Sequence, residues 1–196
     1  MEGLIEIKCL ADIEDDIYTE IAIVFVDSYY KELKVFSDDK EKLVRIFKNS
    51  LVPEAFYVAI MDGHVAGILG CSDNKRRALE IHQSDVYENV GYLKGLLVHY
   101  MLEKEFNTPL SYENNIAYIE CVATGAAARG KGVATKLLDY ALKRLPYNEY
   151  RLTVTDTNKD ALSIYEKNGF KEVDRMKATF FEKRRFNYKL YMKYTN

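Results

Sequence analysis

Apolar positions in the first fifty residues follow the spacing of one strand and two helices. Residues 5–10 are expected to form a strand, and over residues 12–33 the apolar side chains fall near helical spacing at Ile13, Ile17, Ile21, Val24 and Phe25. Ser37, followed by two aspartates, then begins a second helix, because these residue types favour a helix N-terminus. This second helix carries Leu43, Ile46 and Phe47 on one side.

Two further apolar runs predict a β-hairpin. They cover residues 55–61 and 64–71 and are separated only by Asp62-Gly63. A two-residue hairpin turn favours this dipeptide because both positions take a positive φ. The hairpin is therefore the first strand pair that the sequence predicts.

Residues 72–115 show a less regular pattern. A polar and basic stretch comes first, and one helix is expected over residues 85–105 despite Gly91 and Gly95. Pro109 lies in the segment's last part. We expect residues 72–115 to form a helical insertion that is specific to this protein.

The order of elements is clearer after residue 116. A strand over residues 117–124 leads through a glycine-rich turn into a helix over 132–145, which Pro146 ends, and a strand follows at 150–155. This order predicts a βαβ unit.

One more helix and one more strand are expected near the C-terminus. Thr157 with Asp160 resembles a capping box for the helix, which Asn168-Gly169 stops. Over residues 186–194 apolar and polar positions alternate, so this segment predicts a strand with one buried face.

Composition places these elements in a single domain. The chain has 196 residues, 48% of them hydrophobic, a formal charge of -2 and a pI near 6.0, which gives no global field for nucleic acid. No segment predicts membrane targeting or spanning, so we expect a cytoplasmic protein with no nucleic-acid or membrane partner. Neither the histidines nor the cysteines have metal-ligand spacing, so no metal is expected; these residues are His64, His82, His99, Cys9, Cys71 and Cys121.

The glycine-rich turn predicts an anion site, because it exposes backbone N–H groups at a helix N-terminus. One interpretation is a nucleotide-binding P-loop, since residues 125–131 fit G-x-x-x-x-G-K. A P-loop places Ser or Thr next, where its hydroxyl holds magnesium, and this chain has Gly132. The P-loop is therefore the weaker interpretation.

A second interpretation begins at Arg129. Residues 129–134 fit R/Q-x-x-G-x-G/A, and residues 158–170 continue with Asn158, Ala161, Tyr165 and the closing Gly169-Phe170. With these two motifs, in this order and spacing, the sequence resembles the GNAT superfamily of acetyl-CoA-dependent N-acetyltransferases. The resemblance implies a mixed α/β (α+β) fold with a twisted, mostly antiparallel sheet flanked by helices. It also implies that residues 1–196 form one acetyltransferase domain, with acetyl-CoA as co-substrate.

The resemblance assigns the cofactor contacts residue by residue. It places the CoA pyrophosphate on the turn, at Arg129, Gly130, Lys131, Gly132, Val133, Ala134 and, at the edge, Thr135. It places the pantetheine arm along the strand, at Cys121, Val122, Ala123 and Thr124. Asn158 is expected to be a helix cap, a CoA contact or both.

Three residues are candidates for the chemistry. The resemblance gives the N–H of Val122 to the oxyanion and the phenol of Tyr165 to the leaving CoA thiolate. Glu120 is a candidate general base, because a carboxylate in mid-strand is unusual and its position two residues before Val122 predicts the same face of the sheet. A structural partner for Glu120, such as Lys or Arg, is an equal alternative, and water is another base.

These residues predict transfer of an acetyl group to a primary amine by direct attack. The acceptor, a small molecule or a protein amine, and the oligomeric state are left open by the sequence. A non-catalytic CoA-binding sensor is the alternative from a different class, and Tyr165 argues against it.

Overall fold

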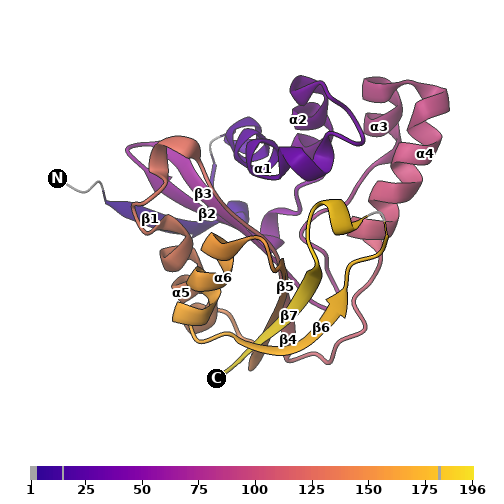
Figure 1. The fold of residues 1–196 in the computed structure, drawn as a ribbon. Helices are drawn as coiled ribbons and strands as arrows, with labels where there is room; N and C mark the ends of the chain where they lie inside the picture. Colours follow the sequence, from indigo (N-terminus) through magenta and orange to yellow (C-terminus); the bar gives the residue numbers. More distant parts are fainter. Residues whose placement is uncertain (1–3, 15, 181) are drawn as a thin grey trace.

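One seven-stranded sheet organises the chain in the computed structural model, which describes residues 4–14, 16–180 and 182–196 (Figure 1). The strand order is β1-β2-β3-β4-β5-β7-β6, and every neighbouring pair is antiparallel except β4 and β5. The strands are β1 (Ile5–Cys9), β2 (Phe56–Met61), β3 (His64–Ser72), β4 (Ile116–Thr124), β5 (Glu149–Thr155), β6 (Lys171–Lys177) and β7 (Tyr188–Thr195). The predicted fold class, a mixed α/β protein with a mostly antiparallel sheet, is confirmed.

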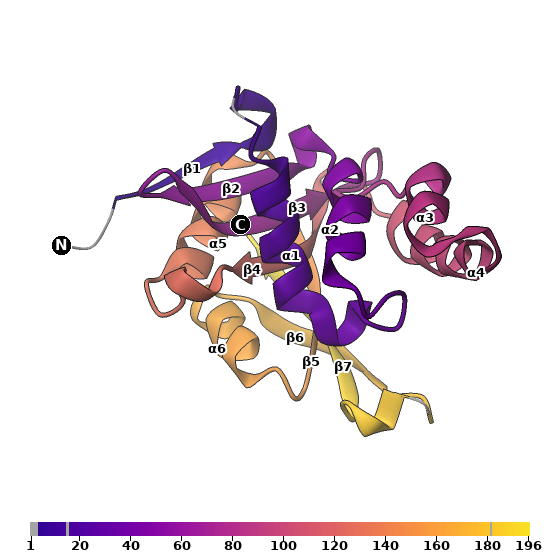
Figure 2. The same cartoon turned by 90° about the horizontal axis from the view of Figure 1, so that it is seen from above.

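Helices cover both faces of this sheet (Figures 1 and 2). They are α1 (Tyr18–Leu33), α2 (Lys40–Asn49), α3 (Gln83–Val90), α4 (Tyr92–Leu102), α5 (Val133–Arg144) and α6 (Lys159–Lys167). Helices α1 and α2 lie on one face, with α3 and α4 beyond α2, and α5 and α6 lie on the other. As expected, β4, α5 and β5 form a βαβ unit.

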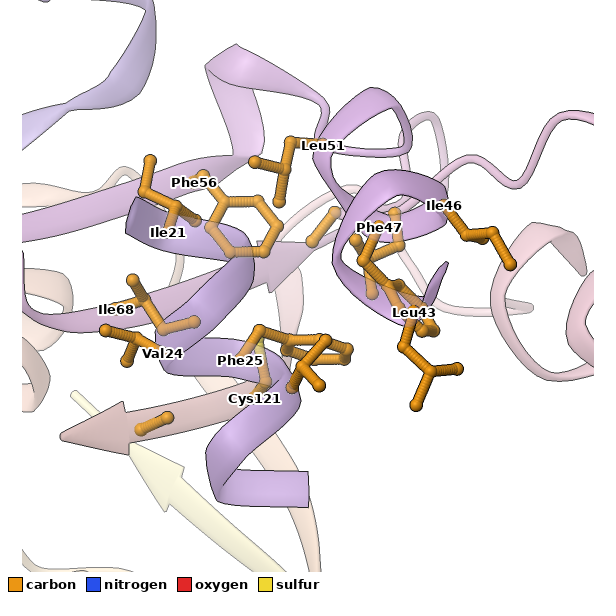
Figure 3. Packing of buried hydrophobic residues seen from close by; sticks show 14 of the residues in the cluster. Ile21, Val24, Phe25, Leu43, Ile46, Phe47, Leu51, Phe56, Ile68 and Cys121 are labelled. Carbon is orange, nitrogen blue, oxygen red and sulfur yellow. The ribbon is translucent and has the colours of Figure 1, made fainter. Parts of the chain in front are cut away.

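Each face of the sheet has its own hydrophobic cluster. The first joins α1 and α2 to the sheet, with the rings of Phe25 and Phe47 only 4.8 Å apart (Figure 3). The second lies under α5 and α6 and includes Val133, Leu137 and Leu152. Complete burial of one such side chain contributes about 1.5–3 kcal/mol, so both clusters hold helices firmly on the sheet.

The predicted hairpin between β2 and β3 is confirmed. Asp62 and Gly63 have φ of 53° and 81°, as a tight turn between β2 and β3 requires.

Helix α2 begins after Asp39, whose carboxylate accepts hydrogen bonds from two N–H groups of the first turn. Helix α1 begins only at Tyr18, because residues 10–12 form a separate 3-10 turn. Asp15, within the expected helix range, lies outside the described residues.

The single helix expected over residues 85–105 was wrong. Gly91 has φ of 81°, which ends α3 and begins α4 there. Gly95 stays inside α4, and a Cβ on it would lie 2.5 Å from the ring of Tyr87, so the glycine allows α3 and α4 to pack closely. A short π-helix, Glu103–Asn107, follows α4.

Two details near the C-terminus also differ from the sequence prediction. Strand β6 was not predicted, because all of its residues are exposed and no apolar alternation marks it. Helix α6 is capped by Asn158 rather than by Thr157, since the Asn158 side chain accepts from the N–H of Ala161. Across the described part of the chain, no helix is long and apolar enough to cross a membrane.

Candidate active site

The parallel strands β4 and β5 separate partway along their length. Their paired residues run from Ile116 and Glu149 to Ile119 and Leu152 and stop there. In the same place the register between β3 and β4 skips Glu120, because Cys71 pairs with Ile119 and Gly70 with Cys121. A β-bulge at Glu120 therefore bends the second half of β4, and leaves one edge of it without a neighbouring strand.

This bulge also changes which side chains face which cluster. Ile119 and Val122 pack with the cluster under α5, whereas Cys121 and Ala123 belong to the cluster under α1. The expectation that Glu120 shares the face of Val122 was wrong, because strict alternation fails at a bulge.

The open edge of β4 carries the backbone groups of Val122. Its N–H donates to the hydroxyl oxygen of Tyr29 at 3.1 Å, and its carbonyl accepts from the same hydroxyl at 3.2 Å. Both groups therefore point away from β3. The groups of Thr124 point the same way, because backbone direction alternates along a strand. Among the residues expected to hold the pantetheine arm, Val122 and Thr124 thus direct their backbone groups to the open edge, where Tyr29 bonds those of Val122.

The glycine-rich turn connects this edge to the N-terminus of α5. Gly130 and Gly132 have φ of 76° and 75°, a conformation that glycine adopts without steric cost. Gly132 is the N-cap of α5, and no side chain in the described part of the chain caps the helix. The N–H groups of Val133, Ala134 and Thr135 consequently have no partner one turn earlier in the helix.

The shape and charge of this turn fit a phosphate group. A Cβ built on Gly130 or Gly132 would meet no atom within 4 Å, so open space lies directly against the backbone. The side chains of Arg129 and Lys131 are exposed beside it. A positive helix end, amides without a helical partner and two cations are features that favour an anion.

Tyr165, on α6, lies beside β4. Its ring packs against Phe170, with centroids 5.9 Å apart, and contacts the cluster under α5. Burial, then Cys121 and Tyr118, raise the pKa of the Tyr165 phenol above its usual value. The pKa of Tyr29 is also raised, by burial and then by Cys121 and Tyr165, so the two phenols lie near one another beside β4. Both are proton donors across the physiological range.

Asn158 lies at the start of the same helix, α6. Its side-chain oxygen is used in the helix cap, 3.3 Å from the N–H of Ala161. This geometry supports the expected cap.

Glu120 is buried and paired with a cation. Its side chain is 4% exposed and forms an ion pair with Arg77, whose guanidinium also donates to the carbonyls of Glu105 and Thr108. Burial raises the pKa of the Glu120 carboxyl, against the lowering effects of Arg77 and Ser72. Within the described residues, Oε2 of Glu120 has no hydrogen-bond partner. Glu120 thus has a structural partner at one carboxylate oxygen, and its other oxygen is buried.

Cys121, between these residues, is buried on the α1 side, and burial raises its pKa to about 12. It is therefore a thiol near neutral pH and packs as a small apolar residue. Among the described residues no group of three or more His, Cys, Asp or Glu side chains could hold a metal ion.

Two residues of the site were missed at the sequence level. Arg77 belongs to a basic stretch that gave no hint of its partner, 43 positions later. Tyr29 lies four residues after Phe25 on α1, a spacing that indicates a shared helix face but not the contact with Val122, 93 positions away.

The model of the acetyltransferase (GNAT) family matches residues 18–170. A search of the curated proteins finds no match.

Solved structures resemble the chain over almost its whole length. An N-acetyltransferase from Staphylococcus aureus Mu50 is 20% identical with a TM-score of 0.65, covering 96% of this chain and 100% of that one. The histone acetyltransferase HPA2 and related acetyltransferase from Corynebacterium glutamicum is 16% identical with a TM-score of 0.62, covering 98% and 96%. A chain of the NatC complex bound to Gag peptide and CoA is 18% identical with a TM-score of 0.57, covering 98% of each. At these identities the likeness shows a shared fold.

Proposed function

Because the chain belongs to the acetyltransferase (GNAT) family, we propose that it transfers an acetyl group from acetyl-CoA to a primary amine. The observation that carries this proposal is the continuity of two features. The open edge of β4 at Val122 and Thr124 is followed along the chain by the turn at Gly130 and Gly132, where open space lies against the backbone. Acetyl-CoA has an extended arm that ends in a thioester and carries a diphosphate at its other end, so its arm would suit the edge and its diphosphate the turn.

The cofactor would lie along these features with its charge at the turn. The pyrophosphate would accept hydrogen bonds from the amides of residues 130–135 and lie beside Arg129 and Lys131. The pantetheine amides would pair with Thr124 as an added strand does. The likeness to a chain of the CoA-bound NatC complex supports this cofactor.

The chain's own groups would then assist two steps, the attack of the amine on the thioester and the departure of the CoA thiolate. The neutral amine attacks the thioester carbonyl, forming a C–N bond while the carbonyl electron pair moves to oxygen. The N–H of Val122 holds that oxygen. When the carbon–sulfur bond breaks, the phenol of Tyr165 gives a proton to the thiolate, because a neutral phenol is a suitable acid for it.

The amine must lose a proton in the same reaction. We assign this proton to Glu120 through an intervening water, because Oε2 has no hydrogen-bond partner among the described residues and burial raises the carboxyl pKa. Arg77 would hold the other oxygen in place.

A thiol-release assay tests the function. Purified protein is mixed with acetyl-CoA and, separately, with a polyamine, an aminoglycoside, an amino acid and a peptide with a free N-terminus. Amine-dependent release of CoA supports the proposal. Tight binding of acetyl-CoA without release for any amine would instead favour a non-catalytic CoA sensor. Glu120→Gln, which keeps the shape of the side chain, should lower turnover of the accepted amine by at least tenfold if Glu120 is the base.

A further inference from the structure

The hydroxyl of Tyr29 lies at Val122 on β4, whose backbone N–H is the proposed donor to the thioester oxygen. It bonds both the N–H and the carbonyl of Val122, at 3.1 and 3.2 Å. A phenol in this position satisfies an edge that would otherwise be a buried, unpaired donor and acceptor.

A thioester oxygen that bonds the N–H of Val122 must enter the space next to this hydroxyl. It replaces the Tyr29 oxygen as acceptor, and the Tyr29 O–H is then within reach of the same oxygen. A small tilt of the Tyr29 side chain, whose ring centroid lies 5.1 Å from that of Phe25, would make room for this oxygen. The two donors therefore converge on one acceptor.

We propose that Tyr29 is a catalytic residue whose hydroxyl and the Val122 N–H together hold the thioester oxygen as it becomes negative. This inference rests on the proposed acetyl transfer. No proton leaves Tyr29 during the step: the negative charge forms on the substrate oxygen, is held by two hydrogen bonds, and returns to the carbonyl when the thiolate departs. Tyr29 thus differs from Tyr165, which gives its proton away.

The matched variants are Tyr29→Phe and Tyr30→Phe. The hydroxyl of the neighbouring Tyr30 donates to the carbonyl of Asp38 at 2.6 Å, on the exposed side of α1, so its loss controls for a missing phenol on the same helix. Loss of one oxyanion donor typically lowers kcat by about 10²-fold. We expect that loss in Tyr29→Phe, with KM for acetyl-CoA changed by less than about threefold, and no change in Tyr30→Phe.

Other results would overturn the inference. Wild-type kcat in Tyr29→Phe would show a packing role, and a lower KM with unchanged kcat would show that Tyr29 only blocks the site. Thermal melting of both variants checks that they are folded. Both of these results are compatible with the proposed acetyl transfer. A wild-type protein that neither binds acetyl-CoA nor releases CoA would contradict both this inference and the proposed function.

A separate observation concerns the outer side of α4. Six large apolar side chains on this helix are 41–86% exposed; this α4 stripe consists of Tyr92, Leu93, Leu96, Leu97, Tyr100 and Met101. The opposite side of α4, with Gly95, Val98 and Leu102, is buried in the fold. Figure 2 shows α4 at the outer limit of the molecule, away from the sheet. A contiguous apolar surface on the order of several hundred Å² marks an interaction site.

The charges around the stripe indicate its occupant. Lys94 lies near the N-terminal end, and the exposed Glu103 and Glu105 outnumber Lys104 just beyond the C-terminal end. Two copies of α4 packed antiparallel bring Lys94 of each copy near the acidic end of the other. A membrane surface would instead favour a helix flanked mainly by cations. We infer that the α4 stripe joins two copies of this chain.

Sedimentation velocity at protein concentrations from about 1 to 100 μM tests this surface. The wild type should be a dimer and Leu97→Glu a monomer. Leu4→Glu, at a still more exposed leucine outside the stripe, should remain a dimer. A wild type that is monomeric throughout, a dimeric Leu97→Glu, or a monomer that pelleted with anionic phospholipid vesicles would contradict the inference.

Discussion

Gly67 on β3 lies directly beneath Val133, the first residue of α5. A Cβ on Gly67 would come within 2.5 Å of Cγ1 of Val133 and 2.8 Å of the carbonyl oxygen of Ala123. The absence of a side chain therefore sets how closely the start of α5, and with it the glycine-rich turn, approaches the sheet.

The first prediction concerns this contact. Gly67→Ala forces Val133 or the backbone of β4 to move, and overpacking of this kind costs about 1–3 kcal/mol. We expect a lower midpoint in urea unfolding and weaker acetyl-CoA binding, because the turn moves with α5. Stability and affinity both equal to those of the wild type would show that α5 can shift without cost.

The second prediction separates backbone strain from cofactor binding. Gly132 and Gly63 have φ of 75° and 81°, and a Cβ on either would meet no atom within 4 Å. Alanine at either position should therefore cost a similar amount of stability, about 1 kcal/mol. Only Gly132→Ala should weaken acetyl-CoA binding, by about tenfold or more, because a methyl group projects into the proposed pyrophosphate position. Equal affinities of the two variants in calorimetry would remove the pyrophosphate from this turn.

The third prediction concerns pH and Tyr165. Burial raises the pKa of this phenol above its usual value of about 10. The acid form therefore persists through the alkaline range, and kcat should show no fall between pH 8 and about pH 10 that depends on Tyr165. Tyr165→Phe should lower kcat by about 10²-fold or more at every pH in this range. A descending limb below pH 9 that disappears in Tyr165→Phe would contradict the assignment.

The fourth prediction concerns the buried pair of Arg77 and Glu120. Arg77→Met leaves a carboxylate alone in a buried position, which costs about 3–5 kcal/mol at neutral pH. Because burial already raises the pKa of Glu120, and loss of the cation raises it further, the folded state of the variant favours the protonated acid. The stability of Arg77→Met should therefore be greatest at low pH and fall as pH rises through this pKa.

Urea unfolding at pH 5 and pH 8 measures this effect. The control is Arg175→Met, which removes an exposed partner of Glu172 and should cost at most about 1 kcal/mol at either pH. If Arg77→Met were as stable as the control at pH 8, the pair would have no structural role.

Local chemistry explains which parts of the fold were predictable. The hairpin follows from Asp62-Gly63 because a positive φ at two successive positions limits the residue types to a few. The turn before α5 follows from two glycines for the same reason. Strand β6 gave no signal, since its side chains are all exposed and only hydrogen bonds to β7 define it. The break at Gly91 was missed because a glycine can lie inside a helix, as Gly95 does.

The site was predictable where it is local and not where it depends on distant contacts. Residues 129–135 are continuous in the sequence, so their pattern identifies the turn. The bulge at Glu120 depends on pairing with β3, and no residue type in β4 indicates it. The contact of Tyr29 with Val122 depends on how α1 packs over the sheet. Register and helix placement are properties of the folded chain, and this explains why the wrong face was expected for Glu120.

Calorimetric titration with acetyl-CoA tests the central claim most directly, with ATP and magnesium titrated in a parallel cell. The account predicts saturable binding of one acetyl-CoA per chain and no binding of ATP with magnesium. An absence of acetyl-CoA binding, or binding of ATP with magnesium in its place, would contradict it.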